Sequence, residues 1–196
     1  MAKYFLSYLS KALLLIFLFG SMTACYSVKK AVKQSYPNSK EIRWPKDYQP
    51  EEAQFFVHNE IDIQASPETV WSVLIQADEW ETYYKGGTEL QLIENTSGQL
   101  AENAVFTWKT MGLDFTSQVK EFEAPYRLSW ESTRKNLKGY HAWLIIPNEN
   151  GCKLITSEAQ YGFMTFPQKV FVPNKLERLH DKWLSQIKIK SEQLDR

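Results

Sequence analysis

Hydrophobic and polar residues alternate in a series of short segments that begins at Phe55. Phe55, Val57, Ile61 and Ile63 recur at near-alternate positions, which is typical of a strand with one buried face. Further strand-like segments follow, separated by turns that contain Gly, Pro or Asn. We predict these strands at 89–95, 104–111, 113–123, 126–134, 137–146 and 152–161. Short links between successive strands indicate an antiparallel meander.

Helical spacing occurs in two other places. After the first strand, Ser66 suits an N-cap and Pro67 the first helical position, which predicts a short helix there. A second short helix is predicted over 78–84. Near the end of the chain, residues 174–194 keep apolar residues at helical spacing and predict one long helix. Pro173 suits the first turn of that helix and would obstruct its interior.

The order of elements predicts an α+β fold. One strand, two short helices, six strands and a long helix follow one another along the chain. We expect a curved antiparallel sheet of about seven strands wrapped around the C-terminal helix, so that the sheet buries the helix's apolar stripe. Where sheet and helix do not meet fully, a cavity remains between them.

The first residues of the chain predict where the protein is located in the cell. Lys3 and Lys11 flank the start, residues 12–19 are apolar, and small residues lead into Cys25. This is the pattern of a secretory signal peptide, and the apolar run is too short to span a bilayer. The sequence Met-Thr-Ala before Cys25 resembles the lipobox of bacterial lipoproteins, which implies removal of residues 1–24 and lipidation of Cys25. Ordinary secretion, with Cys25 incidental, is the alternative.

The predicted leader and lipidation site divide the chain into three parts. Residues 1–24 are the predicted lipoprotein signal peptide, 25–54 a lipid-anchored polar tether with an ordered arm around Trp44, and 55–196 the folded domain. The tether is polar and interrupted by proline. We expect a lipid-anchored protein of the bacterial cell envelope. Tyr26 is not the Asp that retains lipoproteins in the inner membrane of enteric bacteria, which favours the outer membrane.

Charge and cysteine content exclude two classes of protein. The chain has 23 basic and 23 acidic residues, and loss of the leader removes only Lys3 and Lys11. The slightly acidic remainder lacks the basic excess that nucleic-acid binding requires. With Cys25 lipidated, Cys152 has no partner, so a packed core and not a disulfide framework must stabilise the domain.

Several local sequences, taken in order, resemble a known family. They are IQASPETVW at 63–71, EFEAPYRLSW at 121–130, HAW at 141–143 and HDKWL at 180–184. Residues 55–194 resemble the START-related superfamily, also called SRPBCC, and within it the polyketide cyclase/dehydrase-like group. The resemblance implies a helix-grip fold. It is less specific for function, because the family includes lipid carriers, hormone receptors, cyclases and proteins of no known activity.

Aromatic residues on successive strands are candidates for the wall of an apolar cavity. Pointing inward, they would hold a sterol-like, acyl or aromatic ligand, and the alternative is that they simply fill the core. The predicted cavity residues are Phe106, Trp108, Phe115, Trp130, Trp143, Glu158 and Phe163. For the strand at 137–146 two faces remain possible. Either Tyr140, Ala142, Leu144 and Ile146 point inward, or His141, Trp143 and Ile145 do.

His141 and Glu158 are the candidate catalytic pair. They lie near the middles of neighbouring predicted strands, and a base beside an acid suits proton abstraction next to a carbonyl. The alternative is that one or both face solvent or form an ordinary hydrogen bond. His58, His141 and His180 are single and far apart in the sequence, so we predict no metal site and no cofactor, and we expect His180 to pack on the closing helix.

These observations favour a non-enzymatic function. We expect a membrane-tethered lipoprotein that binds a hydrophobic small molecule or lipid between the sheet and the C-terminal helix. A cyclase- or dehydratase-like enzyme that uses the same pocket is the first alternative. An envelope module that binds a protein partner, with its pocket filled, is the second.

Overall fold

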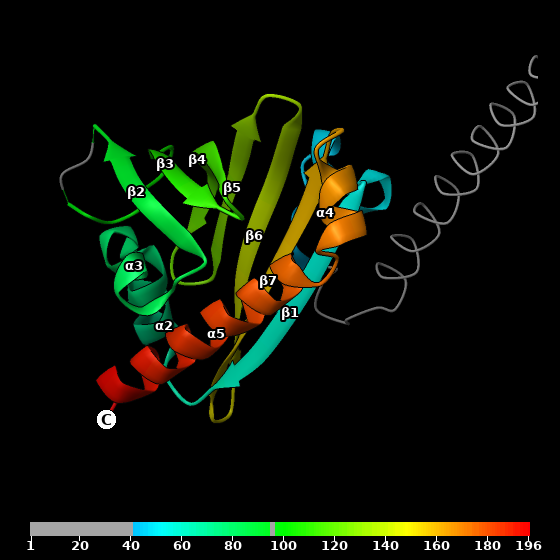
Figure 1. The fold of residues 1–196 in the computed structure, drawn as a ribbon. Coiled ribbons are helices and arrows are strands. Elements are labelled where there is room, and N and C mark those ends of the chain that lie inside the picture. Colours follow the sequence, from blue (N-terminus) through cyan, green and yellow to red (C-terminus); the bar gives the residue numbers. More distant parts are fainter. Residues whose placement is uncertain (1–40, 95–96) are drawn as a thin grey trace, which may run out of the picture.

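The computed structural model describes residues 41–94 and 97–196 (Figure 1). The predicted signal peptide, Cys25 and most of the predicted tether lie outside these residues. Within the described part of the chain, no helix is both long and apolar enough to span a bilayer.

A seven-stranded antiparallel sheet forms the body of the protein, with the order β1-β7-β6-β5-β4-β3-β2. Strands β2 to β7 form the predicted meander, and β1 joins its β7 edge, so the α+β fold predicted from the sequence is confirmed. The strands are β1 (Phe55–Ile63), β2 (Gly87–Ile93), β3 (Val105–Thr110), β4 (Leu113–Glu123), β5 (Arg127–Arg134), β6 (Leu137–Asn148) and β7 (Gly151–Tyr161).

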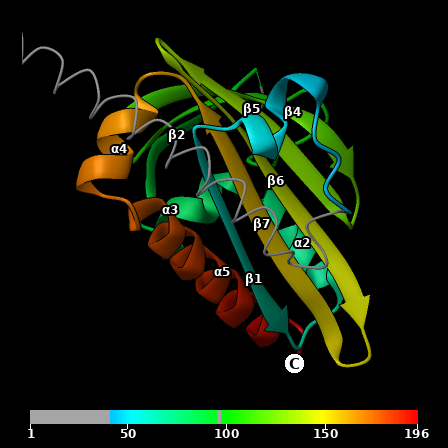
Figure 2. The same ribbon diagram turned by 90° about the vertical axis from the view of Figure 1, so that its right-hand side faces the viewer.

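One long helix, α5 (Lys175–Leu194), crosses the concave face of this curved sheet (Figures 1 and 2). The short helix α2 (Pro67–Ile75) follows β1 and begins as predicted, because the Thr69 backbone N–H donates a hydrogen bond to Ser66 Oγ at 3.2 Å. The remaining helical segments are η2 (Lys46–Tyr48), η3 (Pro50–Glu52), η4 (Ala77–Glu79), α3 (Trp80–Tyr83) and α4 (Thr165–Phe171).

The core between sheet and α5 is aromatic at one end. Trp183 of α5 packs edge-on against Trp80 and Trp143, each with ring centroids 4.9 Å apart. Phe106 and Trp130 complete this group, and all five side chains are fully buried. Interlocking rings of this size fill the space under the middle of α5 and fix the helix on the sheet.

The outer face of the sheet is also covered. Ile42 and Tyr48, which precede β1, pack on Tyr140, Leu144 and their neighbours on β6 and β7. The folded unit therefore begins before residue 55 and includes residues that the sequence assigns to the tether. The contact has a physical basis, because the aromatic and aliphatic side chains around Trp44 cover apolar surface that would otherwise face water.

The covered outer face also decides the orientation of β6. His141, Trp143 and Ile145 point toward α5, whereas Tyr140 and Leu144 point toward the N-terminal arm. Both faces of this central strand are buried. For that reason the hydrophobic pattern of residues 137–146 did not distinguish the inner face from the outer one.

Candidate functional site

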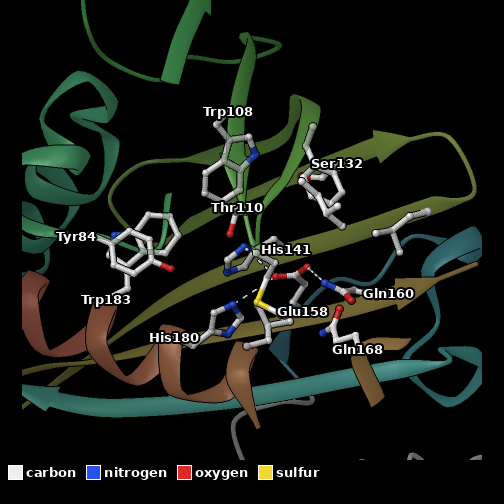
Figure 3. Close-up of a pocket in the computed structure, with 15 residues that line it drawn as sticks. Tyr84, Trp108, Thr110, Ser132, His141, Glu158, Gln160, Gln168, His180 and Trp183 are labelled. Atoms are coloured by element: carbon white, nitrogen blue, oxygen red, sulfur yellow. Dashed lines mark hydrogen bonds and ion pairs between the residues drawn. The ribbon is translucent and has the colours of Figure 1, made fainter. Parts of the chain in front are cut away.

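A narrow cavity lies under the N-terminal half of α5, beyond the aromatic end of the core (Figure 3). The space that can take the centre of a water molecule is about 20 Å³, which is room for about one or two waters. Its apolar walls include Trp108, Phe115, Leu113, Leu137 and Leu176. Sheet and helix thus leave a slot between them that is too narrow, in this conformation, for a bulky ligand.

Three titratable side chains meet in this cavity. His141 on β6 lies directly opposite Glu158 on β7 in the strand register, and His180 reaches them from α5. Glu158 Oε2 is 3.5 Å from His141 Nδ1 and 3.3 Å from His180 Nε2. Figure 3 shows the three side chains converging from two strands and a helix. The side chains of both histidines are almost fully buried, and that of Glu158 is 14% exposed.

Neighbouring polar groups hold part of this cluster in place. Gln160 Nε2 donates a hydrogen bond to Glu158 Oε1 at 2.6 Å, and His141 Nε2 lies 2.7 Å from Thr156 Oγ1. Other polar atoms are left over. Among the described residues, His180 Nδ1, Gln160 Oε1 and Gln168 Nε2 are buried without a hydrogen-bond partner. All three residues line the cavity, so its polar side offers hydrogen-bonding atoms that the protein itself does not use.

Burial and charge set the protonation of the cluster. Burial lowers the pKa of His141 to about 3, against the attraction of the Glu158 carboxylate, so the imidazole is neutral near pH 7. Burial alone would raise the pKa of Glu158, but His180 and His141, together with Gln160, hold this pKa below its ordinary value. A neutral imidazole beside an ionised carboxylate follows. Neither group has a pKa near 7, where general acid–base catalysis is most effective.

The structure places the predicted cavity residues in three different surroundings. Trp108, Phe115 and Glu158 line the cavity, and so does His141. Phe106, Trp130 and Trp143 lie instead in the close-packed core, each at most 1% exposed, because Trp80 and Trp183 fill the space in front of them. Phe163 differs most from its prediction. It follows the turn at Gly162, outside the sheet–helix interface, and is 74% exposed.

Several cavity residues were not predicted from the sequence, among them four with polar groups. Tyr84, Gln160, Gln168 and His180 all contribute polar atoms to the cavity. For His180 a signal was present, because it shares the apolar stripe of α5 with Leu176 and with Trp183. The three histidines are far apart in sequence, yet the fold brings His141 and His180 together, with ring centroids 4.7 Å apart. His58 is the one that stays apart, on the outer face.

The donor atoms of His141, Glu158 and His180 all lie within 4.8 Å of one another. Two imidazole nitrogens and a carboxylate oxygen form a set that can hold a metal ion. The same set can hydrogen-bond the polar group of an organic ligand, because its atoms face the cavity.

Comparison with known proteins places this geometry in a family. A family model described as polyketide cyclase/dehydrase and lipid transport matches residues 54–192. No curated protein matches the chain at the level of sequence. Among solved structures, the hypothetical protein jhp0584 from Helicobacter pylori is 30% identical, with a TM-score of 0.71. The match covers 76% of this chain and 95% of that one.

Two more distant structures share the fold alone. A Thalictrum norcoclaurine synthase point mutant, in complex with a transition-state analogue, is 12% identical with a TM-score of 0.57, over 72% of this chain and 96% of that one. The di-domain ARO/CYC protein BexL from the BE-7585A biosynthetic pathway is 17% identical with a TM-score of 0.56, over 70% of this chain and 50% of that one. The match to the family model over most of the described chain is decisive: this protein belongs to the polyketide cyclase/dehydrase and lipid transport family.

Proposed function

We propose that the protein is a lipid-anchored protein of the bacterial envelope that binds a hydrophobic small molecule or lipid between the sheet and α5. The observation that carries the proposal is the cavity itself, which has apolar walls and one polar side. The family description, which includes lipid transport, supports the same class of ligand. The leader ending at Cys25 supports the anchor.

The chemistry of the cavity narrows the class of ligand that could bind. Trp108 and Phe115 offer apolar and aromatic surface, and the Glu158 carboxylate offers a hydrogen-bond acceptor beside them. The unused atoms of Gln160 and Gln168 add one acceptor and one donor. A molecule that is mostly apolar and carries one small polar group matches this arrangement. A purely hydrocarbon ligand would leave these buried polar atoms unpaired, which is unfavourable.

The mouth of the cavity supports entry from a lipid surface. Helix α4 contributes Gln168 to the cavity, and its outer side is unusually apolar. Phe163 and Phe171, before and at the end of this helix, are 74% and 77% exposed. The slot must widen to admit a ligand, and α4 is the element at its mouth that has few buried side chains to hold it. A fully extended segment from Cys25 to Glu41 could span at most roughly 55 Å, which would allow the mouth to reach a bilayer.

A substitution at the mouth tests ligand binding. We expect native mass spectrometry of the full chain, extracted gently in detergent, to show a bound apolar molecule that organic solvent releases. Gln168→Trp should fill the mouth and reduce the bound fraction several-fold. Gln193→Trp adds the same ring at an exposed position at the far end of α5 and should leave the bound fraction unchanged. Wild-type protein that carries no bound molecule under these conditions would refute the proposal.

A second substitution tests the proposed lipid anchor at Cys25. Cys25→Ser should prevent incorporation of labelled fatty acid and move the protein out of the membrane fraction. Equal labelling of wild type and Cys25→Ser would show that Cys25 is not the lipidated residue. The two experiments are independent, because a soluble ligand-binding domain can exist without an anchor.

An enzyme that uses the same cavity is the second candidate. The observation that favours it is the contact of His141 with Glu158, two titratable groups that face one cavity and could act on a substrate there. The low pKa of His141 counts against this function, because a base of pKa about 3 removes protons poorly near pH 7. His141→Gln separates the two functions, since it should abolish turnover of a substrate but leave binding of an apolar ligand largely intact.

A further inference from the structure

We propose that His141, Glu158 and His180 form a binding site for a divalent transition-metal ion such as Zn²⁺. The site lies on the polar side of the cavity, where one strand pair and α5 bring the three side chains together. This proposal does not depend on the organic ligand proposed above, because it rests only on the positions of the three donor atoms.

Two of the three distances between the donor atoms match those around a tetrahedral ion, and the third, between the two histidine nitrogens, is within 4.8 Å. Ligands that each lie 2.0–2.2 Å from Zn²⁺ are about 3.3–3.5 Å from one another. Glu158 Oε2 is 3.3 Å from His180 Nε2 and 3.5 Å from His141 Nδ1. Hydrogen bonds between a charged imidazole and a carboxylate are shorter, about 2.7–2.9 Å. The spacing therefore suits an ion shared by the three groups better than direct hydrogen bonds between them.

The donor types select the class of metal. Imidazole nitrogen suits Zn²⁺, Fe²⁺, Ni²⁺ and Cu²⁺, whereas Mg²⁺ and Ca²⁺ prefer a shell made of oxygen atoms. Two of the three donors here are imidazole nitrogens. Three protein ligands also leave at least one coordination position open, and the open side faces the cavity lined by Tyr84 and Trp108.

The groups behind the ligands fit this role. Thr156 Oγ1 lies 2.7 Å from His141 Nε2, so an Nε2–H donated to this hydroxyl leaves the lone pair of Nδ1 directed at the site. Gln160 donates to Glu158 Oε1 and leaves Oε2 for the ion. Partners that orient the ligands in this way are typical of metal sites in proteins.

One ligand has to turn slightly when the ion binds. The rings of His141 and His180 lie 18° from parallel, whereas lone pairs that converge on one ion need a larger angle. His180 is the ring that can tilt. Within the described structure its Nδ1 makes no hydrogen bond that would resist rotation about χ2, while His141 is held by Thr156.

The experiment uses the full chain, produced without a polyhistidine tag and stripped of metal with a chelator. We expect isothermal titration with Zn²⁺ to give one site per chain, and His141→Gln, Glu158→Gln and His180→Gln each to weaken binding at least 100-fold. His58→Gln is the matched control, because His58 is also a buried histidine of this sheet but lies on its outer face. It should bind Zn²⁺ like the wild type.

A spectroscopic readout avoids reliance on variants that fold poorly. Co²⁺ bound to the wild-type chain should show the intense visible absorption of a four- or five-coordinate site, and Zn²⁺ should displace it. Thr156→Val, which leaves the ligands in place, should weaken Zn²⁺ binding about 10–100-fold. No stoichiometric Zn²⁺ binding by the wild type would overturn the proposal. Zn²⁺ affinity unchanged in the folded His180→Gln variant would overturn it equally.

Discussion

His58 and His141 are both buried histidines of one sheet, yet their surroundings differ. His58 lies on the outer face, with Nδ1 at 2.7 Å from Ser157 Oγ and Nε2 at 3.6 Å from Glu60. Glu60 is in turn bound by Lys153, whose Nζ donates to it at 2.8 Å. The polar groups around His58 therefore form a chain of pairs between the neighbouring strands β1 and β7, away from the cavity.

His141 lies on the inner face and belongs to a different kind of cluster. It shares Glu158 with His180, and His180 Nδ1 is left without a partner among the described residues. The cluster borders a cavity, so its unused atoms face a space that a ligand or ion can enter. Burial of a histidine therefore does not by itself mark a functional site. Unused polar atoms beside a cavity are the more specific sign.

The largest effect expected from this comparison concerns the packing behind His141. Trp130 is fully buried, and its ring lies 4.7 Å from that of His141 and 5.7 Å from that of Trp80. Trp130→Ala should lower the free energy of unfolding by about 3–5 kcal/mol, because the rings around it cannot close the space. Trp44→Ala, on the outer face where the ring is only partly buried, should cost less. Urea unfolding followed by circular dichroism measures both, and equal losses would contradict the expected difference between the faces.

An intermediate effect concerns pH on the outer face. Burial lowers the pKa of His58, helped by the charge of Lys153 and opposed by Glu60. The folded chain therefore binds fewer protons than the unfolded chain just below pH 6.5, so acid favours unfolding in that window. The loss of stability from this one group is at most about 1.4 kcal/mol per pH unit.

His58→Gln tests this pH dependence, because glutamine keeps a polar group at the site but does not titrate. Thermal unfolding of metal-free wild type and His58→Gln at a series of pH values gives the comparison. Below pH 6.5 the stability of the variant should fall less steeply than that of the wild type. Parallel curves would mean that His58 does not lose its proton on folding and that another group causes the acid effect.

Much of the fold was predictable from local sequence. The predicted strand at 113–123 coincides with β4, and Ser66 caps α2 as expected. These elements depend on periodicity, turn residues and capping, all of which act over a few neighbouring residues. The orientation of β6 was not predictable, because the arm before β1 buries its outer face and both faces then read as apolar.

The site was predictable only in part, for a related reason. His141 and Glu158 were paired correctly because they lie on successive strands, where register follows from the hairpin. His180 joins them only through the way α5 crosses the sheet, and no local pattern determines that crossing. Phe106, Trp130 and Trp143 were placed in the cavity wall and not in the core for the same reason. Whether Trp143 lines a cavity or fills a core depends on where Trp183 of α5 packs.

The smallest effect expected is the removal of the charge next to His58. Glu60 is 26% exposed at its side chain and is paired with Lys153, and such pairs contribute about 0.2–1 kcal/mol. Glu60→Gln should therefore change the free energy of unfolding by no more than this and leave Zn²⁺ affinity unchanged, whereas Glu158→Gln should lose the ion. Both variants remove one carboxylate charge beside a buried histidine, so isothermal titration compares two proteins that carry the same change of charge. If Glu60→Gln weakened Zn²⁺ binding as much as Glu158→Gln, binding would follow the total charge of the sheet, and the distinction between the two histidines would fail. If only Glu158→Gln weakens it, the distinction lies in the convergence of His141, Glu158 and His180 beside the cavity, since each substitution removes one carboxylate charge beside a buried histidine.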